Sequence, residues 1–175
     1  MKTPYVIWLS GLSGAGKSSI ARALQERLKN QGMPSTILDG DDLRSGLNAD
    51  LTFSIEDRIE GARRAAELAK TIIEGGSIAI VALISPFEVQ RENAKNIVGE
   101  SRYIEIYVST PLEVCEARDP KGLYKKAREG SIQDMTGIDS PFEVPKHPHL
   151  VVDTSQESIE EAVNRISLFL LSSKH

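Results

Sequence analysis

The chain has little cysteine, no excess of positive charge and no long apolar segment. Its 175 residues include one cysteine, Cys115, which excludes an intrachain disulfide and a four-cysteine metal site. The net charge of −4 gives no overall basic field that would attract nucleic acid or acidic membranes. The apolar run YVIWLS near the amino terminus is too short to span a bilayer, and no signal-peptide cleavage pattern accompanies it. These absences predict a cytoplasmic protein without nucleic-acid or membrane partners.

Length and composition predict one globular domain over residues 1–175. Apolar residues make up 40% of the chain and charged residues 26%, which is typical of a folded protein and argues against disorder. A chain of this length also buries a substantial apolar core. Cys115 lies in a predicted helix and is expected to be buried, without a redox role.

Apolar runs and amphipathic segments alternate along the chain. Continuous apolar runs predict strands, at residues 5–10, 35–39, 77–85, 103–108 and 150–152. Apolar residues at helical spacing predict helices, at residues 17–31, 55–74, 87–98, 111–117 and 158–171. This alternation predicts an α/β fold with a mainly parallel, five-stranded sheet flanked by helices. Residues 119–148 have four prolines, a basic cluster and no strong periodicity, and are predicted to be a loop-rich excursion or a mobile lid.

The stretch GLSGAGKSS directly follows the first predicted strand. Residues 11–18 match G-x-x-x-x-G-K-[ST], the phosphate loop of the P-loop NTPase fold. Small residues let backbone N–H groups converge on a polyphosphate, and the following helix presents its N-terminal dipole to the anion. The motif therefore predicts a nucleoside triphosphate with Mg²⁺, whereas the alternative is a Gly/Ser turn that binds nothing. The candidate nucleotide-binding residues are Gly11, Leu12, Ser13, Gly14, Ala15, Gly16, Lys17, Ser18 and Ser19.

Within this motif, Lys17 supplies a charge for the β- and γ-phosphates and Ser18 a hydroxyl for Mg²⁺. The chain has no N-K-x-D motif, which argues against a switch GTPase. The strand at 77–85 ends in Ser85 instead of the aspartate usual in large ATPases. Small size and a basic insertion favour a small-molecule kinase.

The segment LDGDDLRSGLN places two carboxylates just beyond the second predicted strand. Ligands of an open parallel sheet bind at that edge, where Asp39 or Asp41 could hold Mg²⁺ through water or accept a proton from an attacking hydroxyl. The alternative for either aspartate is a helix N-cap. Arg44 and Asn48 are spaced to share a helix face, although Arg44 alone also fits a solvated surface charge.

Six segments in order carry a family resemblance: GLSGAGKSS, LDGDDLRSGLN, FSIEDR, ISPF, ARDPKGLYKKAREG and TGIDSPFE. Together they resemble the adenylylsulfate kinases over residues 6–153. The resemblance implies transfer of the ATP γ-phosphoryl group to the 3′-hydroxyl of adenosine 5′-phosphosulfate (adenylylsulfate). The products would be ADP and 3′-phosphoadenosine 5′-phosphosulfate, as in sulfate assimilation. It also implies ATP and Mg²⁺ as cofactors and a homodimer.

The resemblance implies roles for individual residues. Arg44 and Arg58 would bind the phosphosulfate, for which paired guanidinium hydrogen bonds are suited. Phe53 and Phe142 would sandwich the adenine, the alternative for each being core packing. The implied catalytic residues are Lys17, Asp41 and Ser85, and the implied metal ligands are Ser18 and Asp41. Arg118 would lie near the ATP base. The implied acceptor-binding residues are Asp41, Arg44, Asn48, Phe53, Arg58, Ile84, Ser85, Lys121, Leu123 and Phe142.

Two of these roles stay open. Asp41 would act as catalytic base or as metal organiser. Ser85 matches a serine described in the family as a phosphoserine intermediate. Direct in-line transfer needs no covalent stage, however, so contact with the acceptor is the simpler interpretation.

The predicted lid is basic, with Lys121, Lys125, Lys126 and Arg128 close together. A basic lid that closes over two anionic ligands would offset their repulsion and exclude water. The alternative is a solvated helix face.

Gly61 departs from the family pattern, which has asparagine three residues after the Asp-Arg pair of FSIEDR. A glycine cannot supply that side-chain hydrogen bond, so we expect weaker or altered acceptor binding. The sequence also allows two other functions. One is another small-molecule kinase, acting on a nucleoside monophosphate or a sugar acid. The other is a non-catalytic nucleotide-binding protein.

Overall fold

The computed structural model describes residues 4–172, and within them five strands form one sheet with the order β2-β3-β1-β4-β5. The strands are β1 (Val6–Ser10), β2 (Ser35–Asp39), β3 (Ile78–Ala82), β4 (Tyr103–Val108) and β5 (Leu150–Val152). Every neighbouring pair is parallel. The predicted α/β class and parallel sheet are therefore confirmed. The third strand is shorter than predicted, because residues 83–85 leave the sheet and turn into the loop before Pro86.

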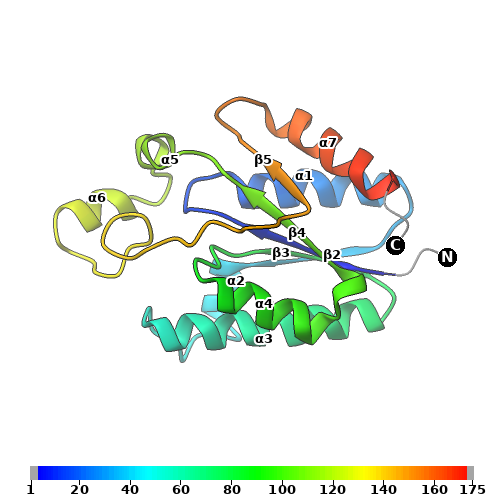
Figure 1. Ribbon diagram of the computed structural model, residues 1–175, viewed down its shortest axis with the longest axis horizontal. Helices are drawn as coiled ribbons and strands as arrows, with labels where there is room; N and C mark the ends of the chain where they lie inside the picture. The colour runs from blue at the N-terminus through cyan, green and yellow to red at the C-terminus, as the bar shows by residue number, and fades with distance from the viewer. Residues whose placement is uncertain (1–3, 173–175) are drawn as a thin grey trace.

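Helices cover both faces of this sheet, with α1 and α7 on one face and α3 and α4 on the other (Figure 1). The helices are α1 (Lys17–Asn30), α2 (Gly40–Ser45), α3 (Ile55–Glu74), α4 (Glu88–Val98), α5 (Leu112–Arg118), α6 (Leu123–Arg128) and α7 (Ile159–Ser172), with a 3-10 turn η1 (Glu100–Arg102). The five predicted helices are confirmed, and each of their ends lies within one residue of its predicted position. Arg44 and Asn48 do not share a helix face as predicted, because α2 ends at Ser45 and Asn48 lies in the following turns.

Alternate residues of the central strand supply the two halves of the core. Ile7 and Leu9 pack with α1 and α7, whereas Val6 and Trp8 pack with α3 and α4. On α3 the buried side chains are mostly alanines, namely Ala62, Ala65, Ala66 and Ala69. Small side chains let α3 approach the sheet closely, because packed interiors leave few voids.

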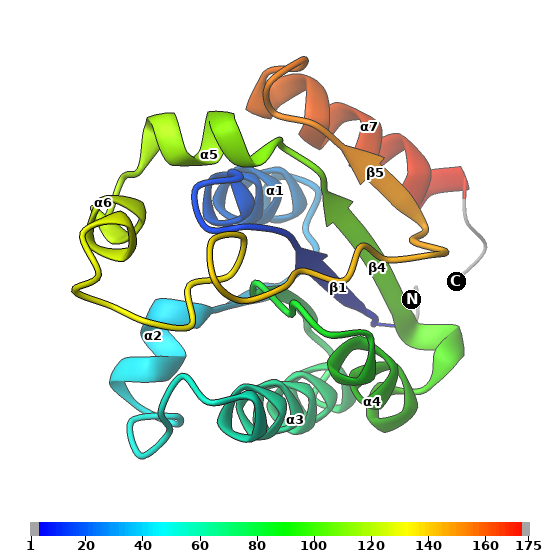
Figure 2. The same ribbon diagram turned by 60° about the vertical axis from the view of Figure 1, so that its left-hand side comes forward.

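The carboxyl ends of β1, β2 and β3 meet at one edge of the sheet. The phosphate loop follows β1, Asp39 ends β2, and Ser85 lies three residues past β3. Residues 119–148, here called the lid segment, leave the sheet after α5 and return across this edge before β5 (Figure 2). In the part of the chain described, no helix is long and apolar enough to cross a membrane.

Candidate active site

A cavity of about 1170 Å³ lies at the carboxyl ends of β1, β2 and β3. Its walls come from the start of α1, from residues 39–62, from the loop after β3 and from the lid segment. Pockets for one small ligand usually measure about 300–1,000 Å³. The cavity is therefore larger than a typical pocket for one small ligand.

The phosphate loop forms one end of the cavity and depends on its glycines. Gly11 has φ +146°, and a Cβ there would lie 2.4 Å from the carbonyl oxygen of Val108. Gly16 has φ +104° and immediately precedes α1. Only glycine adopts this backbone without strain. The loop thus keeps its N–H groups free of side chains, as a polyphosphate cradle requires.

Lys17, at the start of α1, folds back onto the loop. Its Nζ donates to the carbonyl oxygens of Gly11 at 2.8 Å and Leu12 at 2.7 Å. Burial lowers the pKa of Lys17 to about 8, because desolvation disfavours the charged amine. A bound phosphate anion would raise the pKa of Lys17 again, because a nearby negative charge favours the protonated amine.

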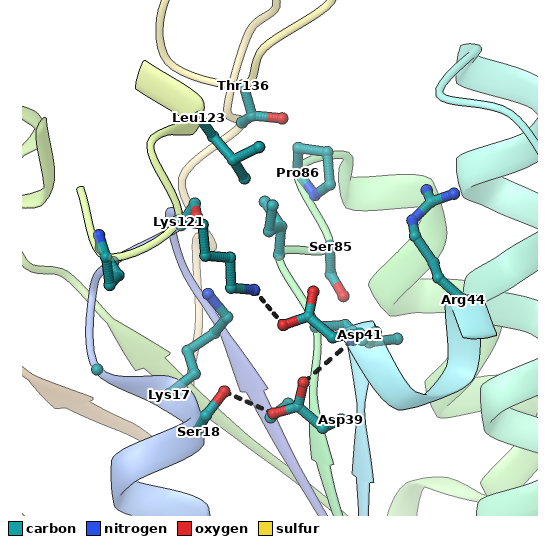
Figure 3. Close-up of a pocket in the computed structure, with 18 of the residues that line it drawn as sticks. Lys17, Ser18, Asp39, Asp41, Arg44, Ser85, Pro86, Lys121, Leu123 and Thr136 are labelled. Atoms are coloured by element: carbon teal, nitrogen blue, oxygen red, sulfur yellow. Dashed lines mark hydrogen bonds and ion pairs between the residues drawn. The ribbon is translucent and has the colours of Figure 1, made fainter. Parts of the chain in front are cut away.

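Ser18 hydrogen-bonds to Asp39, whereas the resemblance implied Asp41 as the metal ligand beside Ser18. The Ser18 hydroxyl donates to Asp39 Oδ2 at 2.5 Å, and Asp39 Oδ1 accepts from the Asp41 backbone N–H at 3.1 Å (Figure 3). Asp39 is thus also the N-cap of α2, which confirms the capping alternative. The helix that starts there turns Asp41 toward the lid, where its carboxylate forms an ion pair with Lys121.

The Ser18–Asp39 oxygen pair fits a magnesium ion. Mg²⁺ binds hard oxygen ligands and keeps several waters, so one hydroxyl and one carboxylate beside a polyphosphate are sufficient. Among the described residues, no group of three or more His, Cys, Asp and Glu side chains could hold a metal alone. Of the two carboxylates that the sequence offered for Mg²⁺, Asp39 is therefore the one that the geometry favours.

The other end of the cavity is formed by two arginines around an exposed ring. The Arg44 guanidinium lies 4.0 Å from the centroid of the Phe53 ring, which is 59% exposed. Arg58 reaches the lid, where Nη1 donates to the Thr136 hydroxyl at 2.6 Å and Nη2 donates to the Asp134 carbonyl oxygen. An accessible aromatic face beside two guanidinium groups suits a nucleotide with an anionic tail.

Phe142 does not take part in the expected sandwich with Phe53. Its ring stacks on Tyr107 of β4, with 5.7 Å between centroids, and Phe142 is absent from the cavity lining. The next residue explains this path, because the Glu143 N–H donates to the Pro86 carbonyl oxygen at 2.7 Å and fastens this end of the lid segment. Phe142 is partly buried against Tyr107, so it belongs neither to the predicted sandwich nor to the buried core.

The remaining predicted residues divide into those at the cavity and those outside it. Ile84, Ser85, Lys121, Leu123, Arg118, Asn48 and Gly61 line it, together with Ser13, Gly14, Gly16 and Ser19. Gly11, Leu12 and Ala15 belong to the phosphate loop without lining the cavity, and Lys125, Lys126 and Arg128 also lie outside. Arg128 instead pairs with Glu116 at 2.7 Å, so the solvated-face alternative holds for the later lid cations.

Two predicted residues make hydrogen bonds to other segments of the chain. Arg118 donates to the Gly14 carbonyl oxygen at 3.3 Å and to the Thr154 hydroxyl at 2.7 Å, which places it beside the phosphate loop. The Ser85 hydroxyl faces the cavity, and its Oγ accepts from the Trp8 indole N–H at 3.0 Å. The Thr154 and Thr136 contacts were not predicted, since single threonines in loops carry no sequence signal.

Gly61 lies on α3 in close contact with Asn48. A Cβ at this position would lie 3.2 Å from Asn48 Nδ2, which itself donates to the Gly61 carbonyl oxygen at 3.4 Å. The Asn48 side chain is buried, and its Oδ1 has no hydrogen-bond partner within the described structure. A larger residue at 61 would therefore move Asn48.

Comparison with known proteins agrees with this site. A family model described as adenylylsulphate kinase matches residues 3–153. The chain belongs to the adenylylsulfate kinase family. The adenylyl-sulfate kinase of Bacteroides thetaiotaomicron is 55% identical over 161 residues, which cover 92% of this chain and 80% of that one.

Solved structures of adenylylsulfate kinases share the fold. The Mycobacterium tuberculosis APS kinase in complex with AMPPNP and APS superposes with a TM-score of 0.95 at 41% identity, covering 98% of this chain and all of that one. The hexameric APS kinase from Thiobacillus denitrificans has a TM-score of 0.73 at 32% identity. It covers 97% of this chain and 29% of that one. Both confirm the P-loop kinase architecture.

Proposed function

We propose that this protein transfers the γ-phosphoryl group of ATP to the 3′-hydroxyl of adenosine 5′-phosphosulfate, which yields ADP and 3′-phosphoadenosine 5′-phosphosulfate. The observation that carries this proposal is one cavity with a phosphate loop at one end and Arg44, Arg58 and Phe53 at the other. Family membership supports the same reaction. We place this reaction in sulfate assimilation in the cytoplasm.

On the ATP side, residues 11–19 surround the phosphates and Arg118 lies toward the base. Lys17 moves from the loop carbonyl oxygens to the β- and γ-phosphates and stabilises the charge that develops during transfer. Ser18 and Asp39 would hold Mg²⁺, which would neutralise phosphate charge when bound. The helix dipole of α1 adds to the same field.

On the acceptor side, Arg44 and Arg58 bind the phosphosulfate and Phe53 stacks on the adenine. Stacking of a base on an aromatic ring contributes about 1–3 kcal/mol. Asn48, Ile84 and Leu123 complete this wall. Because Phe142 lies elsewhere, Phe53 supplies the aromatic contact on one side of the base.

Transfer takes place between these two ends. Asp41 accepts the proton of the 3′-hydroxyl, and Lys121, its ion-pair partner, compensates charge on the transferred group. Ser85 orients the acceptor through its cavity-facing hydroxyl. Positioning and charge stabilisation suffice for in-line transfer, so Ser85 forms no covalent intermediate.

We also propose that residues 1–175 act as one domain, that residues 119–148 close as a lid, and that the protein is a homodimer. Two contacts support lid closure, because Lys121 and Arg58 already join the lid segment to the acceptor wall. Light scattering during size-exclusion chromatography measures the oligomeric state directly.

The deciding experiment measures ADP release from MgATP with adenylylsulfate, with AMP and without acceptor. We expect release that depends on adenylylsulfate and is negligible with AMP. Release with AMP would instead assign a nucleotide kinase. ATP binding without release to either acceptor would indicate a binding protein and overturn the proposal.

A further inference from the structure

Ser85 holds a backbone conformation that its own side chain disfavours. Its φ of +46° lies in the left-handed region, which residues other than glycine rarely adopt. Such a conformation persists only where surrounding groups fix it. Two donors do so here: Trp8 Nε1 donates to Ser85 Oγ at 3.0 Å, and Arg91 Nη1 donates to the Ser85 carbonyl oxygen at 2.7 Å.

Arg91 extends from α4 and lies outside the cavity, with only 3% of its surface exposed. Its three guanidinium nitrogens face three different segments. Nη1 donates to the Ser85 carbonyl oxygen, Nη2 donates to the Glu143 carbonyl oxygen at 2.8 Å, and Nε lies 3.2 Å from Glu105 Oε1. The loop after β3, the end of the lid segment and β4 therefore meet on one side chain.

A second set of contacts links two of these segments directly. The Glu143 N–H donates to the Pro86 carbonyl oxygen at 2.7 Å, and Glu143 Oε2 accepts from the Glu88 N–H at 2.6 Å. The far end of the lid segment is thus bound to the loop that carries Ser85. Arg91 lies beneath that junction and bonds to both partners.

We propose that Arg91 is a positioning residue for the acceptor site. This inference rests on the proposed function. By holding the Ser85 carbonyl group, Arg91 keeps the Ser85 hydroxyl turned toward the cavity. By holding the Glu143 carbonyl group, it fixes the end of the lid segment against the loop after β3. An arginine is required because a planar guanidinium donates to two carbonyl oxygens in fixed directions while its charge pairs with Glu105, whereas an ammonium is a single point charge.

Two variants and one control test this inference. Arg91→Lys keeps a charge near Glu105 and loses the planar fork. The double variant Arg91→Leu with Glu105→Leu removes both buried charges, so that neither remains unpaired. Ile166→Val on α7 is the control, because it loosens a fully buried contact in the opposite half of the core.

The readouts are kcat, the two KM values, Tm and amide hydrogen exchange at Glu143. We expect both Arg91 variants to lose at least tenfold in kcat/KM for adenylylsulfate while KM for MgATP stays within twofold. Exchange at Glu143 becomes faster. Ile166→Val lowers Tm and leaves both KM values unchanged.

Three results would overturn the inference. The first is an Arg91 variant that folds and keeps kcat/KM for adenylylsulfate within twofold. The second is an equal rise in both KM values. The third is failure of Arg91→Lys to fold, which would assign Arg91 to the fold as a whole. If the parent protein itself shows no turnover with adenylylsulfate, the proposed function fails. Exchange at Glu143 then decides alone, and an unchanged rate in Arg91→Lys overturns the inference.

Discussion

At the scale of single residues, Lys17 links nucleotide binding to pH. Burial lowers its pKa to about 8 in the free protein, and phosphate oxygens would raise it again. Above pH 8 the free protein holds a neutral amine, so binding must take up a proton and affinity falls as pH rises. We expect ATP affinity to fall about tenfold between pH 7.5 and 9, by proton linkage.

Titration calorimetry in buffers of different ionisation enthalpy measures both the affinity and the proton uptake. The control is Lys17→Met, which should bind ATP weakly with no dependence on pH in this range. A parent affinity that stays flat from pH 7.5 to 9 would contradict the lowered pKa.

Asp39 caps α2, and one substitution separates this role from the Mg²⁺ binding that we propose for it. Asparagine is as good an N-cap as aspartate, so Asp39→Asn should change the free energy of unfolding by less than about 1 kcal/mol. The same change removes the carboxylate beside Ser18. We expect the Mg²⁺ concentration for half-maximal activity to rise about 10–100-fold.

A magnesium titration of ADP release at fixed ATP measures this effect. Glu56→Gln, which removes a carboxylate outside the cavity lining, is the matched control and should not shift the requirement. An unchanged Mg²⁺ requirement in Asp39→Asn would return the metal role to Asp41.

At the scale of elements, α3 carries both Arg58 and Gly61, and Gly61 packs closely against Asn48. Gly61→Ala gains about 1 kcal/mol of helix propensity but crowds Asn48, whose Nδ2 would be 3.2 Å from the new Cβ. Gly61→Asn crowds Asn48 equally and adds an amide on the cavity side. We therefore expect Gly61→Asn to bind adenylylsulfate several-fold more tightly than Gly61→Ala. Equal affinity of the two variants for adenylylsulfate, measured as KM, would remove any role for an amide at this position.

Much of the architecture could be predicted because it is encoded locally. The bounds of α3, β2, β4 and β5 followed from apolar spacing and flanking glycines, and the phosphate loop from its spacing alone. The short helices α2 and α6, of six residues each, are too brief for a periodic signal. Asp39 rather than Asp41 bonds to Ser18, because α2 starts between the two aspartates and turns Asp41 away. Phe142 contacts Tyr107 because the lid segment passes over β4 at that point. Both outcomes depend on tertiary geometry.

At the scale of the whole molecule, the two faces of the sheet support different ends of the cavity. The α1 side carries the phosphate loop, whereas α3 carries Arg58 and Gly61. Ala66 of α3 and Ala21 of α1 are both fully buried, and a leucine at either overpacks its face at a cost of about 1–3 kcal/mol. Overpacking of the two faces should therefore weaken the binding of two different substrates.

We expect Ala66→Leu to raise KM for adenylylsulfate and Ala21→Leu to raise KM for MgATP, each by several-fold and each with a lower Tm. Steady-state kinetics with one substrate saturating separates the two values. If both variants raise the same KM, the faces do not act independently.

Trp8 is the only tryptophan of the chain, and its indole N–H is bonded to the Ser85 hydroxyl at the cavity floor. Indole emission responds to hydrogen bonding and to local charge, so the intensity or wavelength of this one fluorophore reports what lies against Ser85. Acceptor binding is thus visible without a label and without turnover. Trp8 is therefore an intrinsic fluorescent probe of the groups that lie against Ser85.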